Sequence, residues 1–303
     1  MCPMGRHFIL WGVKTLILKE ARTYHEQIVL IRSKGFVIDD EEKCICFLKK
    51  ANYYRLSAYC LPFKNPDGTF FKEILIERIQ RIYDFDSRLR ALLFEIVEEI
   101  EFYLRTQFAY FSGHKYGALG YLESKNFSDK HNEDKFHEKV KSCIDDNKNT
   151  LVVKHHKEKY DGKFPIWVII EFFSIGMLSY FYGDMITEDM KKLAKEIYST
   201  SPDHLKSWLR CLTDLRNRCA HYSRLYYWSF TAMPKMPRGC GYEIDRKLFS
   251  QLLMLKFLFP ERDKWNTNFL IAIKSLLEEY LPDVSLKHIG FPIDWEKHLT
   301  IYN

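Results

Sequence analysis

Between Lys72 and Gly113 apolar residues return every three or four positions, and no other feature constrains the fold as strongly. A spacing of three and four places side chains on one face of an α-helix, so this segment predicts a long amphipathic helix. We expect a break near Phe85-Asp86 that divides it into a short and a long helix. The recurring positions are Ile79, Ile82, Leu89, Leu92, Leu93, Ile96, Val97, Ile100, Leu104 and Phe108.

Helix start and stop signals recur along the rest of the chain. Pro165 is expected at the first position of a near-continuous apolar helix that ends near Gly183. Glu171, glycines and tyrosines within this run favour a buried central helix over a membrane span. The region 115–163 is more polar and predicts loops with one or two solvent-facing helices. Further helices are expected over 24–34 with Thr23 as the cap, from Asp39-Asp40 onward, after Asn52, up to Tyr198 with Thr187 as the cap, from Pro202, and over 243–258 and 266–281.

No segment shows the alternating pattern of a strand, and no internal repeat is visible, so the sequence predicts an all-α fold. The chain has 303 residues, of which 47% are hydrophobic and 28% charged, which suits a globular protein with a substantial core. We expect residues 20–300 to form a single domain and residues 1–19 to be an atypical extension. The apolar stretch 8–18 is too short to span a bilayer, and the eight cysteines form no CxxC pair. These features favour a cytoplasmic protein that does not enter a membrane.

The net charge of +6 is concentrated between His204 and Tyr242, where seven Lys or Arg residues accompany one acid, Asp214. Aromatic residues alternate with these cations, and such a mixture suits single-stranded RNA, because cations pair with phosphates and bases stack on rings. A helix surface with buried rings is an equally good interpretation of the composition alone. The candidate RNA-binding residues are Arg210, Arg218, Tyr222, Arg224, Tyr226 and Tyr227.

Arg216, Asn217 and His221 form the most informative polar motif. Asn217 and His221 are four positions apart and share a helix face, while Arg216 is displaced by about 100° from Asn217 but has a long side chain. An imidazole can accept a proton from a ribose 2′-hydroxyl near neutral pH, and a guanidinium can stabilise the charge that builds on the phosphate. Asn217 could orient the imidazole or hold a phosphate oxygen. The trio therefore suits RNA cleavage that needs no metal or other cofactor.

The motif supplies one proton carrier, whereas acid–base cleavage needs two. The second could come from the same motif of a two-fold-related subunit, so we expect a homodimer with a composite site. Spacing alone favours a plainer interpretation, in which Arg216 is a surface residue and His221 ends a helix.

The segment Leu215–Tyr227 resembles the HEPN signature of the Abi-like (AbiD/AbiF) abortive-infection family. The resemblance covers about residues 20–300 and implies a HEPN-like helical bundle with additional N- and C-terminal helices. It also implies a toxin-like ribonuclease of phage defence that uses Arg216, Asn217 and His221, and a small noncoding RNA as a partner. Tyr222 stands where the family often has a second His. The matching stretches, which follow the family's order, are 23–40, 52–63, 82–93, 100–110, 165–179, 208–227 and 289–298.

Two further pairs match family signatures, Tyr54 with Arg55 and Glu101 with Arg105. For these four residues we favour structural roles, in buried ion pairs and packed rings, over a supporting role at the site. Two alternatives to a nuclease stay open. The protein could be a non-catalytic module that holds a noncoding RNA or a partner protein, or a structural helical protein whose motif is vestigial.

Overall fold

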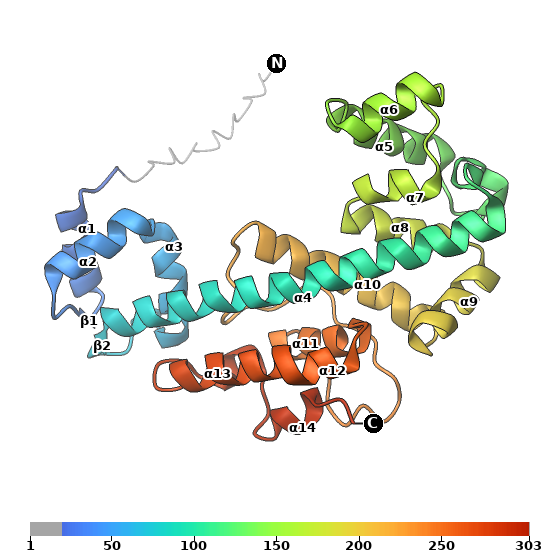
Figure 1. Ribbon diagram of the computed structural model, residues 1–303. Coiled ribbons are helices and arrows are strands. Elements are labelled where there is room, and N and C mark those ends of the chain that lie inside the picture. The colour runs from blue at the N-terminus through green and yellow to red at the C-terminus, as the bar shows by residue number, and fades with distance from the viewer. Residues whose placement is uncertain (1–19, 303) are drawn as a thin grey trace, which may run out of the picture.

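The computed structural model describes residues 20–302, and the predicted extension 1–19 lies outside them. One long helix, α4, runs through the molecule and carries a lobe at each end (Figure 1). The first lobe contains α1 (Tyr24–Ser33), β1 (Phe36–Val37), α2 (Glu41–Lys50), α3 (Tyr53–Ser57) and the 3-10 turn η1 (Ala58–Phe63). The expected all-α character is confirmed.

Short-range capping explains where the first helices begin. The side chain of Thr23 accepts the backbone N–H of Glu26 while Glu26 reaches back to Thr23, a capping box that starts α1. Asp40 accepts from the backbone of Lys43 and starts α2. The two-residue strand β1 pairs in parallel with β2 (Ile74–Leu75), so the start of α4 is tied to the first lobe.

The central helix α4 (Ile76–Tyr116) is continuous over 41 residues, and the expected break near Phe85-Asp86 is wrong. Phe85 and Asp86 are both fully buried on the face that carries Ile82 and Leu89. The carboxylate of Asp86 finds hydrogen-bond partners on other segments, so its burial does not require the helix to end.

The second lobe contains the polar region and the apolar run that follows it. The predicted continuous helix 165–183 is wrong, because it divides after Phe173. Ser174 accepts the backbone N–H of Met177 and caps a new helix, which a Ser can do more readily than an apolar residue. The expected burial of this run is confirmed at Ile169, Phe173 and Phe181. The elements of the second lobe are η2 (Gly120–Leu122), η3 (Ser124–Asn126), α5 (Glu133–Asp146), α6 (Leu151–Lys159), α7 (Ile166–Ile169), η4 (Ile170–Phe172) and α8 (Ile175–Asp184).

Several of the remaining helices pack on α4. Thr187 is the first residue of α9 and not its cap, whereas α10 starts as expected with Pro202 in its first turn. Helix α10 packs on α4, α8, α9 and α11, and α13 also packs on α4. Within residues 20–302 no helix combines the length and the apolar character that crossing a membrane requires. The elements that follow the second lobe in the chain are α9 (Thr187–Tyr198), α10 (Pro202–Ala220), α11 (Leu248–Leu258), α12 (Arg262–Lys264), η5 (Trp265–Phe269), α13 (Leu270–Tyr280), η6 (Leu286–Ile289) and α14 (Trp295–Leu299).

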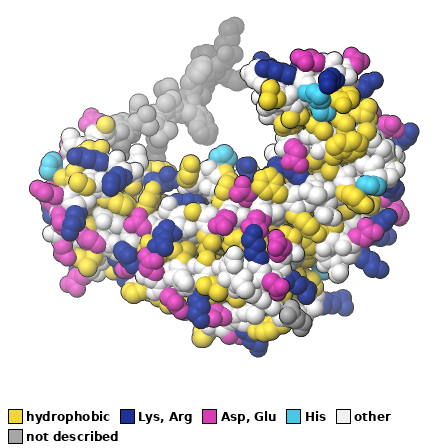
Figure 2. Space-filling view, in the orientation of Figure 1, with side chains coloured by type: hydrophobic (Ala, Val, Ile, Leu, Met, Phe, Trp, Pro, Cys, Tyr) yellow, Lys and Arg dark blue, Asp and Glu magenta, His cyan; other side chains and the backbone are white. Residues whose placement is uncertain are grey.

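The outline of the molecule is concave between its two lobes, above the middle of α4 (Figure 2). Helix α10 runs beside α4, and the segment that follows it reaches back to the first lobe, where Arg224 binds the carbonyl of Ala58. The C-terminal end of α10 is therefore held between α4 and the first lobe.

Candidate functional site

The motif Arg216, Asn217 and His221 lies at the C-terminal end of α10. His221 caps the helix, and its backbone N–H donates to the carbonyls of Asn217 (2.9 Å) and Cys219. The side chains of Asn217 and His221 are exposed, whereas Arg216 is about one-third exposed, at 32%. The motif is therefore accessible from solvent at a helix end.

Arg216 is held next to a buried carboxylate of the central helix. Nε of Arg216 lies 3.7 Å from Oε2 of Glu101, a residue only 7% exposed on α4. Nη1 of Arg216 lies 3.5 Å from the Asn217 side-chain oxygen. No hydrogen bond joins Arg216 to His221 within residues 20–302, and Nε of Arg216 has no hydrogen-bond partner there. The guanidinium is thus anchored by charge to a buried carboxylate while its side chain stays about one-third exposed.

Glu101 also binds Arg105 through its other oxygen, and Arg105 donates in turn to the carbonyl of Phe173 at 2.9 Å. The expected buried ion pair between Glu101 and Arg105 is confirmed. The sequence did not predict that the same carboxylate reaches Arg216, because the two residues are far apart in the chain. A small hollow of about 210 Å³ opens at this cluster, beside Phe94 and Phe102.

The segment after the motif has an unusual backbone. Tyr222 and Tyr227 both adopt positive φ values, 54° each, which residues other than glycine rarely do. Side chains from the first lobe and the segment itself secure it, since Arg55 donates to the carbonyl of Tyr222 and Arg224 to that of Ala58. This conformation is therefore fixed by tertiary contacts and not by local preference.

Asp86 is the buried anchor of this segment. One carboxylate oxygen accepts the backbone N–H groups of Leu225 (3.0 Å) and Tyr226 (2.7 Å), and the other accepts Tyr59 Oη (2.6 Å) and Arg90. Burial raises the pKa of the Asp86 carboxyl group, and the four donors oppose that rise. Sequence reasoning missed this role, although an acid and a base four positions apart on an apolar helix face were a visible signal.

Three of the six candidate RNA-binding side chains face solvent. Arg210 is exposed on α10, and Tyr222 and Tyr227 are 68% and 45% exposed beside the motif. An exposed ring next to a cationic helix end can stack on an RNA base.

Two other candidates, Arg218 and Arg224, have structural partners instead. The guanidinium of Arg218 lies 3.7 Å from the centre of the Trp228 ring and 3.5 Å from the carboxylate of Asp214. Arg224 is half-buried against the first lobe. Desolvation lowers the pKa of both arginines, which still remain charged at neutral pH.

Tyr226, the remaining candidate, is only 1% exposed, so its expected role in stacking on RNA is wrong for this structure. Its hydroxyl lies 2.8 Å from Nδ1 of His288 and accepts the backbone N–H of Ser285. Apolar burial combined with two partners for the hydroxyl makes the inward position favourable.

The Tyr54 and Arg55 pair departs from the structural roles expected of it. Tyr54 is 85% exposed and does not pack in the core, and Arg55 forms no ion pair within residues 20–302. Arg55 instead binds the carbonyl of Tyr222, which places this pair beside the motif. The hydrophobic pattern of 52–63 could not indicate that, because the contact crosses from α3 to the end of α10.

His288 makes the stability of this region depend on pH. Its ring lies against Tyr226 and Tyr227, and partial burial, assisted by Lys247 and Arg78, lowers the pKa of His288. The unfolded chain, with a His pKa of about 6.5, then binds a proton more readily than the folded chain, so stability falls as the pH drops below about 6.5. We expect His288→Gln to show a weaker fall between about pH 7 and about pH 5, measured by urea denaturation at each pH. The same pH dependence in both proteins would contradict this assignment.

Together these contacts define an all-α protein in which a polar helix end is assembled against a long central helix and an anchored loop. The chain belongs to the Abi-like protein family, whose model matches residues 46–227, from within α2 to the end of the anchored segment. Membership in this abortive-infection family confirms the resemblance that the sequence motifs indicate. No curated protein and no solved structure matches the chain.

Proposed function

We propose that this protein is a HEPN-type endoribonuclease of phage defence that cleaves RNA without a metal ion. The observation that carries the proposal is the grouping of Arg216, Asn217 and His221 at an accessible end of α10. Membership in the Abi-like family supports a defensive role. Exposed Tyr222 and Tyr227 beside the motif support RNA as the substrate.

In the proposed reaction, His221 takes the proton from a ribose 2′-hydroxyl. The 2′-oxygen attacks the adjacent phosphorus, a new P–O2′ bond forms, and the P–O5′ bond breaks to leave a 2′,3′-cyclic phosphate. Arg216 stabilises the charge on the phosphoryl oxygens, and Glu101 orients its guanidinium. The side chain of Asn217 positions Arg216 through its amide oxygen and offers its N–H groups to phosphate.

The leaving 5′-oxygen also needs a proton, and in an in-line displacement it departs on the opposite side of phosphorus from the attacking 2′-oxygen, so one imidazole cannot reach both oxygens. We propose that His221 of a second subunit supplies it in a homodimer. The exposed position of His221 at the end of α10 leaves it free to face a symmetry-related copy.

One observation favours a second candidate function, a non-catalytic module that holds a noncoding RNA or a partner protein. Arg216 contacts Glu101 and Asn217, and within residues 20–302 it makes no hydrogen bond to His221. In this alternative, the same surface binds phosphate and no bond is broken.

Bacterial growth on induced expression separates these functions. We expect the wild-type protein to arrest growth and to generate cellular RNA fragments with new 5′-hydroxyl ends, because the proposed reaction leaves that end. Arg216→Ala and His221→Ala are expected to restore growth, whereas His155→Ala, which changes an exposed histidine on α6, should remain toxic. Equal toxicity of all four proteins, without new 5′-hydroxyl ends, would remove the nuclease proposal.

A further inference from the structure

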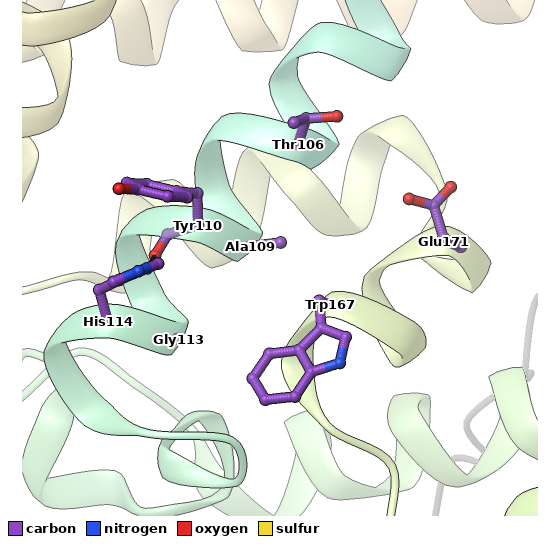
Figure 3. Close-up of a pocket in the computed structure, with 7 residues that line it drawn as sticks. All are labelled: Thr106, Ala109, Tyr110, Gly113, His114, Trp167 and Glu171. Carbon is purple, nitrogen blue, oxygen red and sulfur yellow. Dashed lines mark hydrogen bonds between the residues drawn. The ribbon is translucent and has the colours of Figure 1, made fainter.

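A second concave site lies on the C-terminal part of α4, beyond the Glu101–Arg105 ion pair. It is a groove of about 510 Å³ between α4 and the α7–η4 segment, and its volume falls in the range of roughly 300–1,000 Å³ that small ligands occupy. Figure 3 shows Trp167 and Glu171 on one side of the groove, with Ala109 and Gly113 on the facing surface of α4. Thr106, Tyr110 and His114 complete the lining.

Aromatic rings are presented to solvent at this groove. Trp167 is 55% exposed and Tyr110 is 65% exposed, although both could lower the free energy of the protein by burial. The rings of Tyr110 and His114 contact each other in a tilted arrangement, with ring centres 4.0 Å apart and 36° between their planes. Exposed rings that are held in place by neighbours suit stacking with a flat ligand.

Gly113 is the residue of α4 that lies beside the indole of Trp167. A Cβ atom at this position would lie 3.4 Å from Cε3 of Trp167 and 3.4 Å from Cγ2 of Ile166, in van der Waals contact with both. The indole of Trp167 therefore lies directly beside α4 at Gly113.

Glu171 supplies the polar group of the groove. Its side chain is exposed, and no cation lies within ion-pair distance of it among residues 20–302. A carboxylate offers two hydrogen-bond acceptors side by side. Guanine presents two adjacent donors, N1–H and N2–H, whereas adenine, cytosine and uracil each present an acceptor at one or both of these positions. The carboxylate therefore discriminates in favour of guanine.

We propose that this groove binds a guanine base of single-stranded RNA, with the ring stacked on Trp167 and its Watson–Crick edge bound by Glu171. The proposal rests on the proposed function only in taking RNA as the ligand. Beyond Tyr110 and His114 the adjoining hollow is lined by Lys115 and Lys192. The ion pair of Lys192 with Glu196 is long, at 3.9 Å, and the Lys192 side chain is 62% exposed, so its ammonium group can bind an RNA phosphate. The groove then selects which RNA is held while the motif on α10 acts on it.

Binding of short RNAs that cannot be cleaved tests this proposal independently of nuclease activity. The probes are fluorescein-labelled 2′-O-methyl heptanucleotides, UUUGUUU and UUUAUUU, which lack the attacking hydroxyl, and the readout is fluorescence anisotropy with the full-length protein. We expect the guanine probe to bind the wild type about tenfold more tightly than the adenine probe. Glu171→Gln should remove that preference, because an amide offers one acceptor and one donor at the guanine edge.

Trp167→Ala is expected to weaken binding of the guanine probe by about tenfold, since stacking on an aromatic side chain is lost. Tyr302→Ala, which removes an exposed ring elsewhere on the surface, should leave both affinities unchanged and serves as the matched control.

Three outcomes would overturn the proposal. The first is equal affinity of the wild type for both probes, and the second is an unchanged guanine preference in Glu171→Gln. The third is that Trp167→Ala no longer forms a dimer while its RNA affinity is unchanged, which would make the groove a contact between copies of this chain. Cleavage of RNA without any guanine preference would leave the nuclease proposal standing and remove this one. Guanine-selective binding by a protein that never cuts RNA would support the guanine site and remove the nuclease proposal.

Discussion

His221→Ala is expected to lower the rate of RNA cleavage by at least about 100-fold, because general acid–base catalysis by one group contributes about 10²–10⁴-fold. RNA affinity should change little, since the imidazole is exposed at a helix end while Arg216 remains in place. The measurement is cleavage of a labelled RNA in EDTA, with affinity followed in parallel by anisotropy. His155→Ala is the matched control and is expected to cleave at the wild-type rate.

The same variant tests the composite dimer. If each site takes one imidazole from each subunit, mixed dimers of wild type and His221→Ala lack one of the two proton carriers. Excess His221→Ala protein should then inhibit the wild type more than dilution explains. Cleavage proportional to the amount of wild type would contradict a shared site, and undiminished cleavage by pure His221→Ala would contradict catalysis by this residue.

Asp86→Ala is expected to cause the largest loss of stability, about 3–5 kcal/mol, because it leaves the buried Arg90 without its counter-ion. It also removes the acceptor of the Leu225 and Tyr226 backbone N–H groups and of the Tyr59 hydroxyl. The measurement is the free energy of unfolding from urea denaturation, followed by circular dichroism.

A double variant, Asp86→Leu with Arg90→Met, separates the charge from the hydrogen bonds. Replacing both charges with apolar side chains removes the uncompensated guanidinium, so the double variant should be more stable than Asp86→Ala. It should remain less stable than the wild type, because the backbone N–H groups of Leu225 and Tyr226 still lack an acceptor. A loss of unfolding free energy below about 1 kcal/mol in Asp86→Ala would show that the Asp86 anchor contributes little to stability.

Several features of the fold follow from short stretches of sequence. The spacing of apolar residues predicted the long helix that became α4, and Thr23 and Asp40 indicated helix starts through their capping side chains. These signals work because they depend on residues within one or two turns of each other. The Glu101–Arg105 ion pair belongs to the same group, since its partners are four positions apart.

Other predictions failed where a distant residue decided the outcome. A break at Phe85-Asp86 is a reasonable expectation for an acid in an apolar helix, but donors from two other segments, Tyr59 on η1 and the backbone of Leu225 and Tyr226, make its burial stable. Tyr226 was expected to face RNA, yet a hydroxyl partner on His288 holds it inside. Tyr54 was expected to pack in the core and is exposed. For Asp86 and Tyr226 the deciding contact lies outside the local pattern.

The sequence by itself determined the helical class, the family and the motif at the end of α10, because periodicity, caps and ordered motifs depend only on the order of residues in the chain. Only the tertiary structure decided that Glu101 meets Arg216, that Asp86 anchors the segment after the motif, and that Trp167 and Glu171 face α4 across a groove. The physical reason is that these contacts join side chains from separate helices, and their partners are set by how the helices pack.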